Sequence, residues 1–180
     1  DEFGIHYIEG GYPGSNPKDK EFFERARRMR WRNALICAFG MTRRVGKKVD
    51  EDANMKALVA AGTPVITVVG KSWDFHVTEA LRTTLEENLH AVKETIAYLK
   101  RNADKVFFDA EHFFDGYQHN PKYAMKVLAA AADAGADVLV LCDTNGGSLP
   151  SDVSRIAHEW AAESQLASRK KNIPGKNRNR

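Results

Sequence analysis

The chain has 180 residues, 43% of them hydrophobic, and a formal net charge of +3 at pH 7. No apolar stretch approaches the roughly 18 residues that a membrane-spanning helix needs, and no secretory or transit pattern precedes Phe3. These features indicate one globular domain, exclude a membrane partner and predict a cytoplasmic protein.

The positive charge is concentrated at the end of the sequence. Residues 169–180 hold six Lys and Arg side chains, no acid and almost no apolar residue, in the stretch SRKKNIPGKNRNR. We predict a disordered basic tail over residues 163–180 and a folded domain over residues 1–162. A basic stretch without aromatic side chains favours a solvated tail, so we expect no nucleic-acid partner.

Apolar runs predict strands, each followed by polar or glycine-rich residues and then by a helical pattern. The runs are Ile5–Ile8, Leu35–Phe39, Val65–Val69, Val106–Phe108 and Val138–Leu141. They begin roughly 30 to 40 residues apart, the length of a βα unit that returns to a parallel strand through a right-handed crossover. We therefore predict a parallel sheet covered by helices.

Helices are clearest in the middle and at the end of the chain. Leucines and other apolar residues at steps of three and four predict a helix over Thr78–Lys100, with Thr78 as its cap. An alanine-rich helix is predicted over Tyr123–Asp133 and a further one after Pro150, whose periodicity fails near Gln165.

Length limits the architecture. An eight-unit barrel takes about 250 residues, so this chain holds roughly five or six units. The sequence therefore predicts either an open sheet of flavodoxin type or an incomplete α/β barrel of the TIM (β/α)8 type.

The predicted strand ends carry polar side chains with possible functions: Glu9, Tyr12, Thr42, Arg43, Lys71, Ser72, Asp74, His76, Asp109, Glu111, His112, Asp115, Asp143, Thr144 and Asn145. In a barrel all these loops meet at one mouth, whereas an open sheet concentrates its site at one switch point. Their even distribution favours the barrel. Local structure also explains some of them, since Asp143 and Thr144 precede two glycines as in a turn, and Ser72 and His76 suit a helix entry.

Glu111 and His112 are neighbours directly after an apolar run. On an extended segment adjacent side chains point to opposite sides, so one of the two should face the barrel mouth. We favour Glu111, because a carboxylate there can act as a general acid or base. His112 can equally be a packing or supporting histidine.

The motifs HYIEGGYPGSNPKD, AFGMTRR, GKSWDFHVTEALRTTLEENL, FDAEHFFDGY and VLCDTNGGSLP occur in this order between about residues 3 and 160. Together they resemble the citramalate synthase branch of the isopropylmalate and homocitrate synthase family. The resemblance implies a TIM-type barrel and an acyltransferase that condenses acetyl-CoA with an α-keto acid, pyruvate for this branch, and hydrolyses the thioester. It also implies a divalent metal ion (Mg, Mn or Zn), a place in isoleucine biosynthesis and a homodimer for a full-length relative.

Carried over to this sequence, the resemblance makes Glu111 the active-site carboxylate and Thr144 a contact of the keto-acid carboxylate. Glu9, Ser72, His76 and Asp143 would line the substrate pocket.

The sequence also departs from the family. The Thr-Leu-Arg-Asp-Gly type motif and the His-x-His pair that supply the metal ligands do not occur in it. We therefore assign no metal ligand, and expect roughly units two to six of a barrel that is inactive alone. A related carbon-carbon lyase acting on a hydroxyacyl-CoA, or a non-catalytic binding module from a decayed barrel, are the alternatives.

Overall fold

The computed structural model describes residues 1–171, with side chains described as far as residue 165. The chain divides into two compact units, Asp1–Thr144 and Asn145–Arg180. The first unit contains all the strands of the described chain, and the second contains a helix.

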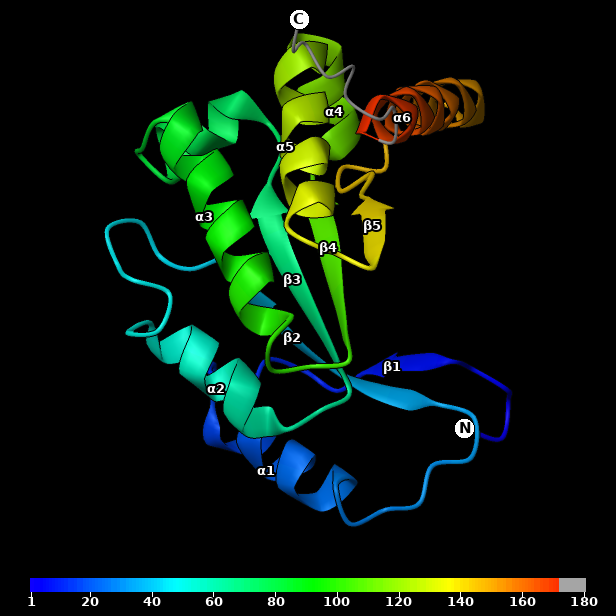
Figure 1. Ribbon diagram of the computed structural model, residues 1–180. Helices are drawn as coiled ribbons and strands as arrows, with labels where there is room; N and C mark the ends of the chain where they lie inside the picture. The colour runs from blue at the N-terminus through cyan, green and yellow to red at the C-terminus, as the bar shows by residue number, and fades with distance from the viewer. Residues whose placement is uncertain (172–180) are drawn as a thin grey trace, which may run out of the picture. The chain divides into compact units, whose positions relative to one another are not determined.

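A five-stranded parallel sheet forms the centre of the first unit, in the order β1-β2-β3-β4-β5 (Figure 1). The strands are β1 (Tyr7–Glu9), β2 (Leu35–Met41), β3 (Val65–Lys71), β4 (Lys105–Glu111) and β5 (Val138–Leu141). The connecting helices are α1 (Pro17–Ala26), α2 (Ala53–Ala61), α3 (Leu85–Leu99), α4 (Phe113–His119) and α5 (Pro121–Asp133), with a π-helix η1 (His76–Ala80) before α3. Because each strand lies beside the next one in sequence, the order has no switch point, and the open flavodoxin-like sheet is excluded.

The sheet curls as the wall of a barrel does. Tyr7 on β1 and Phe107 on β4 lie on strands that are not neighbours, yet their ring centroids are 4.9 Å apart. The Nζ atom of Lys105 also donates to the Tyr7 hydroxyl at 2.8 Å. The same face of β1 and β4 is therefore the inner face of a curved sheet, which confirms the predicted incomplete TIM-type α/β barrel.

The outer face of the sheet packs against helices and forms the core. Ile66 and Val68 on β3, with Val106 and Phe108 on β4, are at most 1% exposed. Burial of such apolar side chains is the main favourable term in folding. β2 approaches α2 closely, since a Cβ atom built on Gly40 would lie 2.7 Å from Leu58 Cδ1.

The start of α3 differs from the prediction. The helix begins at Leu85, and its cap is Thr84, whose Oγ1 accepts from the backbone N–H of Glu87 at 3.1 Å. The predicted start at Thr78 is wrong because the chain first forms η1 and then passes through Arg82 at φ 52°. The pattern Thr-x-x-Glu at Thr84 is a capping signature that locates this start.

The second unit contains α6 (Pro150–Lys171), which begins at proline as predicted. This helix continues beyond the predicted boundary at residue 162 and beyond the loss of periodicity near Gln165. The prediction of a disordered tail falls partly on residues 172–180, which lie outside the described residues. Of the helices described, up to Lys171, none has the length and apolar character to cross a membrane.

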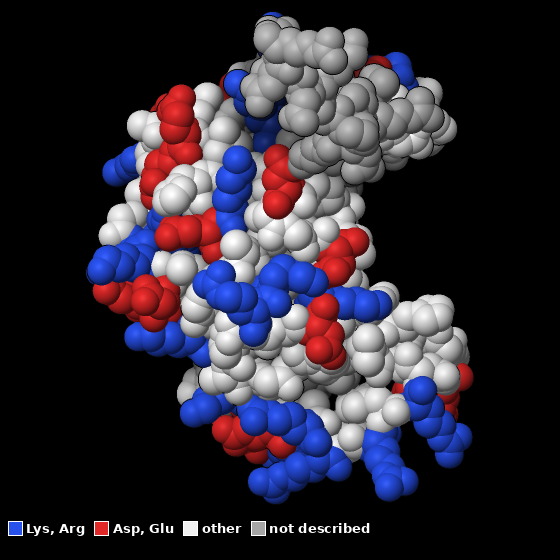
Figure 2. Space-filling view, viewed as in Figure 1, with Lys and Arg blue, Asp and Glu red and all other residues white. Residues whose placement is uncertain are grey.

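Charge is mixed on the face that Figure 2 shows. Lys and Arg side chains gather over α1, with Asp and Glu side chains among them (Figure 2). The absence of a nucleic-acid partner stays a prediction.

Replacing Gly40 with alanine should lower the free energy of unfolding by about 1–3 kcal/mol, because the added methyl group must displace Leu58. The control is Gly147→Ala, where an added Cβ meets no atom within 4 Å and the expected change stays within about 0.5 kcal/mol. Urea denaturation measures both variants. Equal stability of the two would contradict the close packing of β2 on α2.

Candidate active site

Two charged side chains meet where β3 and β4 end. Lys71 and Glu111 are the last residues of these strands, and they are partners in the parallel register. The Nζ atom of Lys71 forms an ion pair with Oε2 of Glu111, and both side chains are about three-quarters buried. The pair holds the Glu111 carboxylate in one orientation, because a charge-assisted hydrogen bond restricts both groups.

Buried polar side chains fix the backbone on both sides of this pair. The Ser72 hydroxyl donates to the Glu111 carbonyl oxygen at 2.6 Å, and Asn88 Nδ2 on α3 donates to the Lys71 carbonyl oxygen at 2.9 Å. Ser72 is 0% exposed and Asn88 is 2% exposed. The observed role of Ser72 is thus to position the backbone of Glu111, and its contact with substrate stays a prediction.

His112 leaves the strand in a way that the sequence did not predict. Its φ of 52° lies in the left-handed region, so the alternation expected of an extended segment ends after Glu111. Its backbone N–H donates to Thr144 Oγ1 at 2.9 Å, and its Nδ1 lies 3.1 Å from Asp115 Oδ2. This turn brings Thr144, which follows β5, next to the end of β4.

His76 lies against the same turn. Its ring centroid is 4.6 Å from that of His112 and 4.7 Å from that of Trp73. Burial lowers the pKa of His76, and the neighbouring His112 and Lys71 lower it further. The imidazole is therefore neutral at neutral pH, and its Nδ1 is buried without a hydrogen-bond partner.

Asp109 lies on the inner face, two residues before Glu111 on β4. Burial raises the pKa of its carboxyl to about 6, with a further contribution from Glu9 at the end of β1. Burial also raises the pKa of the Cys142 thiol to about 11, assisted by the charges of Asp109, Glu111 and Glu9. The ends of β1, β4 and β5 therefore face one another, and Cys142 is a protonated thiol.

The structure thus brings most of the predicted site residues together. The contacts above link Glu111, Ser72, His76 and Thr144. Glu9 lies near enough to them for its charge to raise the pKa of Asp109. Asp143 follows β5 directly before Thr144.

Sequence reasoning named Lys71 and Asp109 among the polar side chains at the strand ends but gave neither a role in the site. The available signal was their position, because Lys71 and Glu111 each end an apolar strand, and the alternation of β4 puts Asp109 on the face of Glu111.

Comparisons with known proteins agree with this geometry. The family model described as HMGL-like matches residues 1–168, which include every strand of the described chain. The chain belongs to the HMGL-like family.

Relatives of this HMGL-like chain include two kinds of synthase. An (R)-citramalate synthase of Aquifex aeolicus is 61% identical over 156 residues, covering 87% of this chain and 30% of the relative. That of Geobacter sulfurreducens is 56% identical over 159 residues, covering 88% and 30%. A 2-isopropylmalate synthase of Streptococcus gallolyticus is 31% identical over 156 residues, covering 87% and 28%. The chain spans about 30% of the length of these relatives, and the predicted resemblance to the citramalate synthase branch is confirmed.

Solved structures support the fold. The HMG-CoA lyase of Bacillus subtilis has a TM-score of 0.65 at 17% identity, over 88% of this chain and 53% of the lyase chain. The hydroxymethylglutaryl-CoA lyase of Pseudomonas aeruginosa has a TM-score of 0.66 at 17% identity, over 89% and 53%. At this identity the likeness shows the fold alone.

Replacing Asp109 with asparagine should remove part of the pH dependence of stability. The Asp109 pKa rises from 3.8 to about 6 on folding, so between these values the folded protein binds more protons than the unfolded chain. Wild-type stability therefore falls as the pH rises from about 4 to about 6, by at most about 3 kcal/mol, and solvent screening reduces that figure.

Urea denaturation at about pH 4 and about pH 7 measures this difference. The control is Asp50→Asn, at an exposed position in the segment between β2 and α2. Identical pH dependence of Asp109→Asn and wild type would show that the Asp109 carboxyl is not shielded from water.

Proposed function

We propose that the protein carrying this chain is an acyltransferase of the citramalate synthase type. It condenses acetyl-CoA with an α-keto acid, pyruvate by preference, and hydrolyses the thioester. The observation that carries the proposal is the convergence of Lys71, Glu111, His76 and Thr144 at the strand ends of a chain that is 61% identical to an (R)-citramalate synthase.

Glu111 is the proposed catalytic carboxylate. Its side chain projects from the inner face of the sheet at the end of β4, and its ion pair with Lys71 fixes its orientation. A positioned carboxylate can move a proton at the carbon or oxygen of a reacting substrate, which contributes about 10²–10⁴-fold to a rate. Ser72 and Asn88 support this geometry through the backbone of the two strands.

Thr144 is the proposed contact of the keto-acid carboxylate. Its Oγ1 already accepts the N–H of His112, so the hydroxyl hydrogen is left to donate to an anionic oxygen. Neutral His76 and the charged groups Glu9 and Asp143 would line the same pocket. Binding a small keto acid against fixed donors is how a site orients it for attack.

The metal ion that the family implies receives no ligand here. Within residues 1–171, no group of three or more His, Cys, Asp and Glu side chains is placed to hold a metal ion. The nearest candidates are already committed, because Glu111 pairs with Lys71 and Asp109 is buried beside Cys142. We therefore derive no step through a metal. A bound divalent ion would supply Lewis-acid polarisation of the keto-acid carbonyl.

The lyase alternative has less support. The similar lyase structures are 17% identical to this chain, whereas the citramalate synthases named above are 56–61% identical. The ion pair at the strand ends also argues against a decayed, non-catalytic barrel, because a decayed site has no need of an oriented carboxylate.

In the whole protein that carries this chain, Glu111→Gln should lower the rate of CoA release from acetyl-CoA and pyruvate by about 10²–10⁴-fold. Lys71→Met should also lower the rate, because Glu111 loses the group that orients it. The measurement is the appearance of the free thiol of CoA, with citramalate identified as the product.

The control for this test is Glu51→Gln, which removes an exposed carboxylate paired with Lys48 at 3.4 Å and should leave the rate unchanged. A wild-type rate in Glu111→Gln would exclude Glu111 from the mechanism. Cleavage of a hydroxyacyl-CoA by the wild-type protein without condensation would replace the proposed function with the lyase.

A further inference from the structure

A cavity with apolar walls lies beside the end of α1. It has a volume of about 320 Å³, and the residues that line it include Phe23, Ala26, Met29, Trp31, Leu35 and Pro64. We call it the α1 hollow. Leu35 begins β2 and Pro64 directly precedes β3, so the α1 hollow lies at the amino-terminal ends of these strands. The Lys71–Glu111 pair lies at the opposite ends, and a molecule in the α1 hollow would leave the candidate active site open.

Apolar side chains of the α1 hollow reach solvent. Met29 is 57% exposed and Leu35 is 37% exposed, whereas Phe23 is only 1% exposed. Single exposed apolar residues are ordinary, but a group of them around one cavity is typical of a surface that contacts a partner. Interfaces between proteins are enriched in Met, Arg and aromatic side chains, and this cavity has all three kinds beside it.

Hydrogen bonds within the chain hold the α1 hollow in shape. Trp31 Nε1 donates to the Ala26 carbonyl oxygen at 3.1 Å, and the Met29 backbone N–H donates to the same oxygen at 3.1 Å. Arg27 Nη2 crosses to α2, where it donates to the Ala60 carbonyl oxygen at 2.7 Å. A ligand therefore meets walls that are already ordered, which lowers the entropic cost of binding.

The surroundings of the α1 hollow are strongly basic. Between residues 25 and 32 the chain has no acid and five exposed arginines, namely Arg25, Arg27, Arg28, Arg30 and Arg32. Arg25 pairs with Glu21, but no acidic side chain among residues 1–165 forms an ion pair with Arg28, Arg30 or Arg32. An adjoining cavity of about 310 Å³ shares Phe23 and Arg27 with the α1 hollow and adds Lys20 and Lys56, beside one acid, Glu24.

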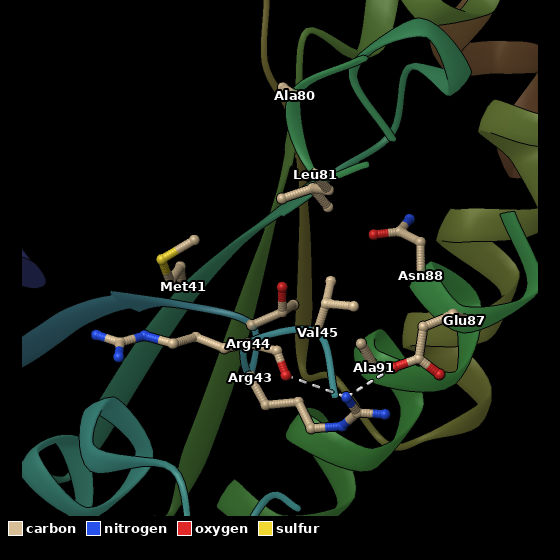
Figure 3. Close-up of a pocket in the computed structure, with 10 residues that line it drawn as sticks. Met41, Arg43, Arg44, Val45, Ala80, Leu81, Glu87, Asn88 and Ala91 are labelled. Carbon is tan, nitrogen blue, oxygen red and sulfur yellow. Dashed lines mark hydrogen bonds and ion pairs between the residues drawn. The ribbon is translucent and has the colours of Figure 1, made fainter. Parts of the chain in front are cut away.

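Arg43 shows the contrasting case of an arginine with partners in the chain. Its side chain is 4% exposed, and its guanidinium pairs with Glu87 at 2.8 Å, as Figure 3 shows, and with Glu94. That charge is neutralised internally. The charges of Arg28 and Arg30, on either side of Met29, are instead available to carboxylates from outside, which the planar guanidinium binds with two parallel hydrogen bonds.

A second copy of the chain and a nucleic acid fit this surface less well. In a two-fold dimer the same patch lies on both sides of the interface, so Arg28, Arg30 and Arg32 would face one another with like charge. Nucleic-acid bases stack on open aromatic faces. Here Phe23 is buried and Trp31 is half-buried, while the exposed walls come from Met29 and Leu35. Such walls suit an apolar side chain.

We propose that the α1 hollow is a docking site for an acidic segment of a protein partner. One large apolar side chain of the segment enters the hollow against Met29 and Leu35, and neighbouring Asp or Glu side chains pair with Arg28 and Arg30. Apolar burial supplies the affinity, and the charge complementarity selects the partner and speeds its association. This inference goes beyond the proposed function and does not depend on it.

Selection of a random peptide library displayed on phage tests the proposal, with the whole protein as bait. The enriched peptides should carry Asp and Glu next to a large apolar residue. The affinity of an enriched peptide is then measured by fluorescence anisotropy, together with that of the same peptide with serine at the apolar position, which should bind about tenfold more weakly.

Variants of the protein separate the two halves of the docking site. Met29→Ser should weaken the enriched peptide by about tenfold, and Met29→Leu should bind it as wild type does, because leucine keeps the apolar wall. Arg28→Glu/Arg30→Glu should weaken it by at least about tenfold. The control is Lys93→Glu/Lys126→Glu, which makes the same change of charge at exposed positions of α3 and α5 and should leave the affinity unchanged.

Four outcomes would overturn the proposal. The first is a selection without acidic, apolar-anchored peptides, and the second is wild-type affinity for the enriched peptide in Met29→Ser. The third is single-stranded RNA that binds more tightly than any peptide and is lost in Arg28→Glu/Arg30→Glu, which would assign the surface to nucleic acid. The fourth is a homodimer in sedimentation velocity that dissociates in Met29→Ser, which would assign it to a second copy.

Discussion

The in-register pairing of β3 with β4 determines where the chemistry lies. Seven successive pairs run from Val65 and Lys105 to Lys71 and Glu111. Because the register is fixed, the last side chains of the two strands stand side by side on the inner face, and the ion pair forms without help from a loop. A slip of one residue would put Ala110 at that place and turn Glu111 toward the helices. The hydrophobic pattern that packs the outer face therefore also holds the site together.

α3 and α5 support this pairing from outside the sheet. Asn88 connects the Lys71 carbonyl on β3 with the Tyr123 hydroxyl on α5, and the Ser72 hydroxyl connects the end of β3 with that of β4. These hydrogen bonds satisfy the carbonyl oxygens of Lys71 and Glu111, the last residues of their strands, in place of water. Small shifts of α3 would thus reach the catalytic pair through a single side chain.

Much of this arrangement could be predicted from the sequence. The apolar runs predicted the strands, and alternation along an extended chain predicted that either Glu111 or His112 faces the barrel mouth. The chemistry of a carboxylate favoured Glu111. Lys71 and Asp109 were candidates by their position at strand ends, but their roles could not be assigned from the sequence, since these roles depend on contacts with other strands. The start of α3 was missed because Leu81 and Leu85 continue one stripe across the break at Arg82. The left-handed turn at His112 has no signal in the composition, and its contact with Thr144 joins residues that are 32 positions apart in the sequence.

The segment KVFFDAEH shows how one strand can serve stability and chemistry together. Val106, Phe108 and Ala110 are fully buried against the helices, whereas Asp109 and Glu111 face the inner side. The acids are tolerated after an apolar run because Glu111 has Lys71 as its partner, while Asp109 can keep a proton at a higher pH than an ordinary aspartate. The two faces can therefore change independently. Substitutions on the outer face alter the free energy of unfolding, and substitutions on the inner face alter the charge and hydrogen bonding that a substrate meets.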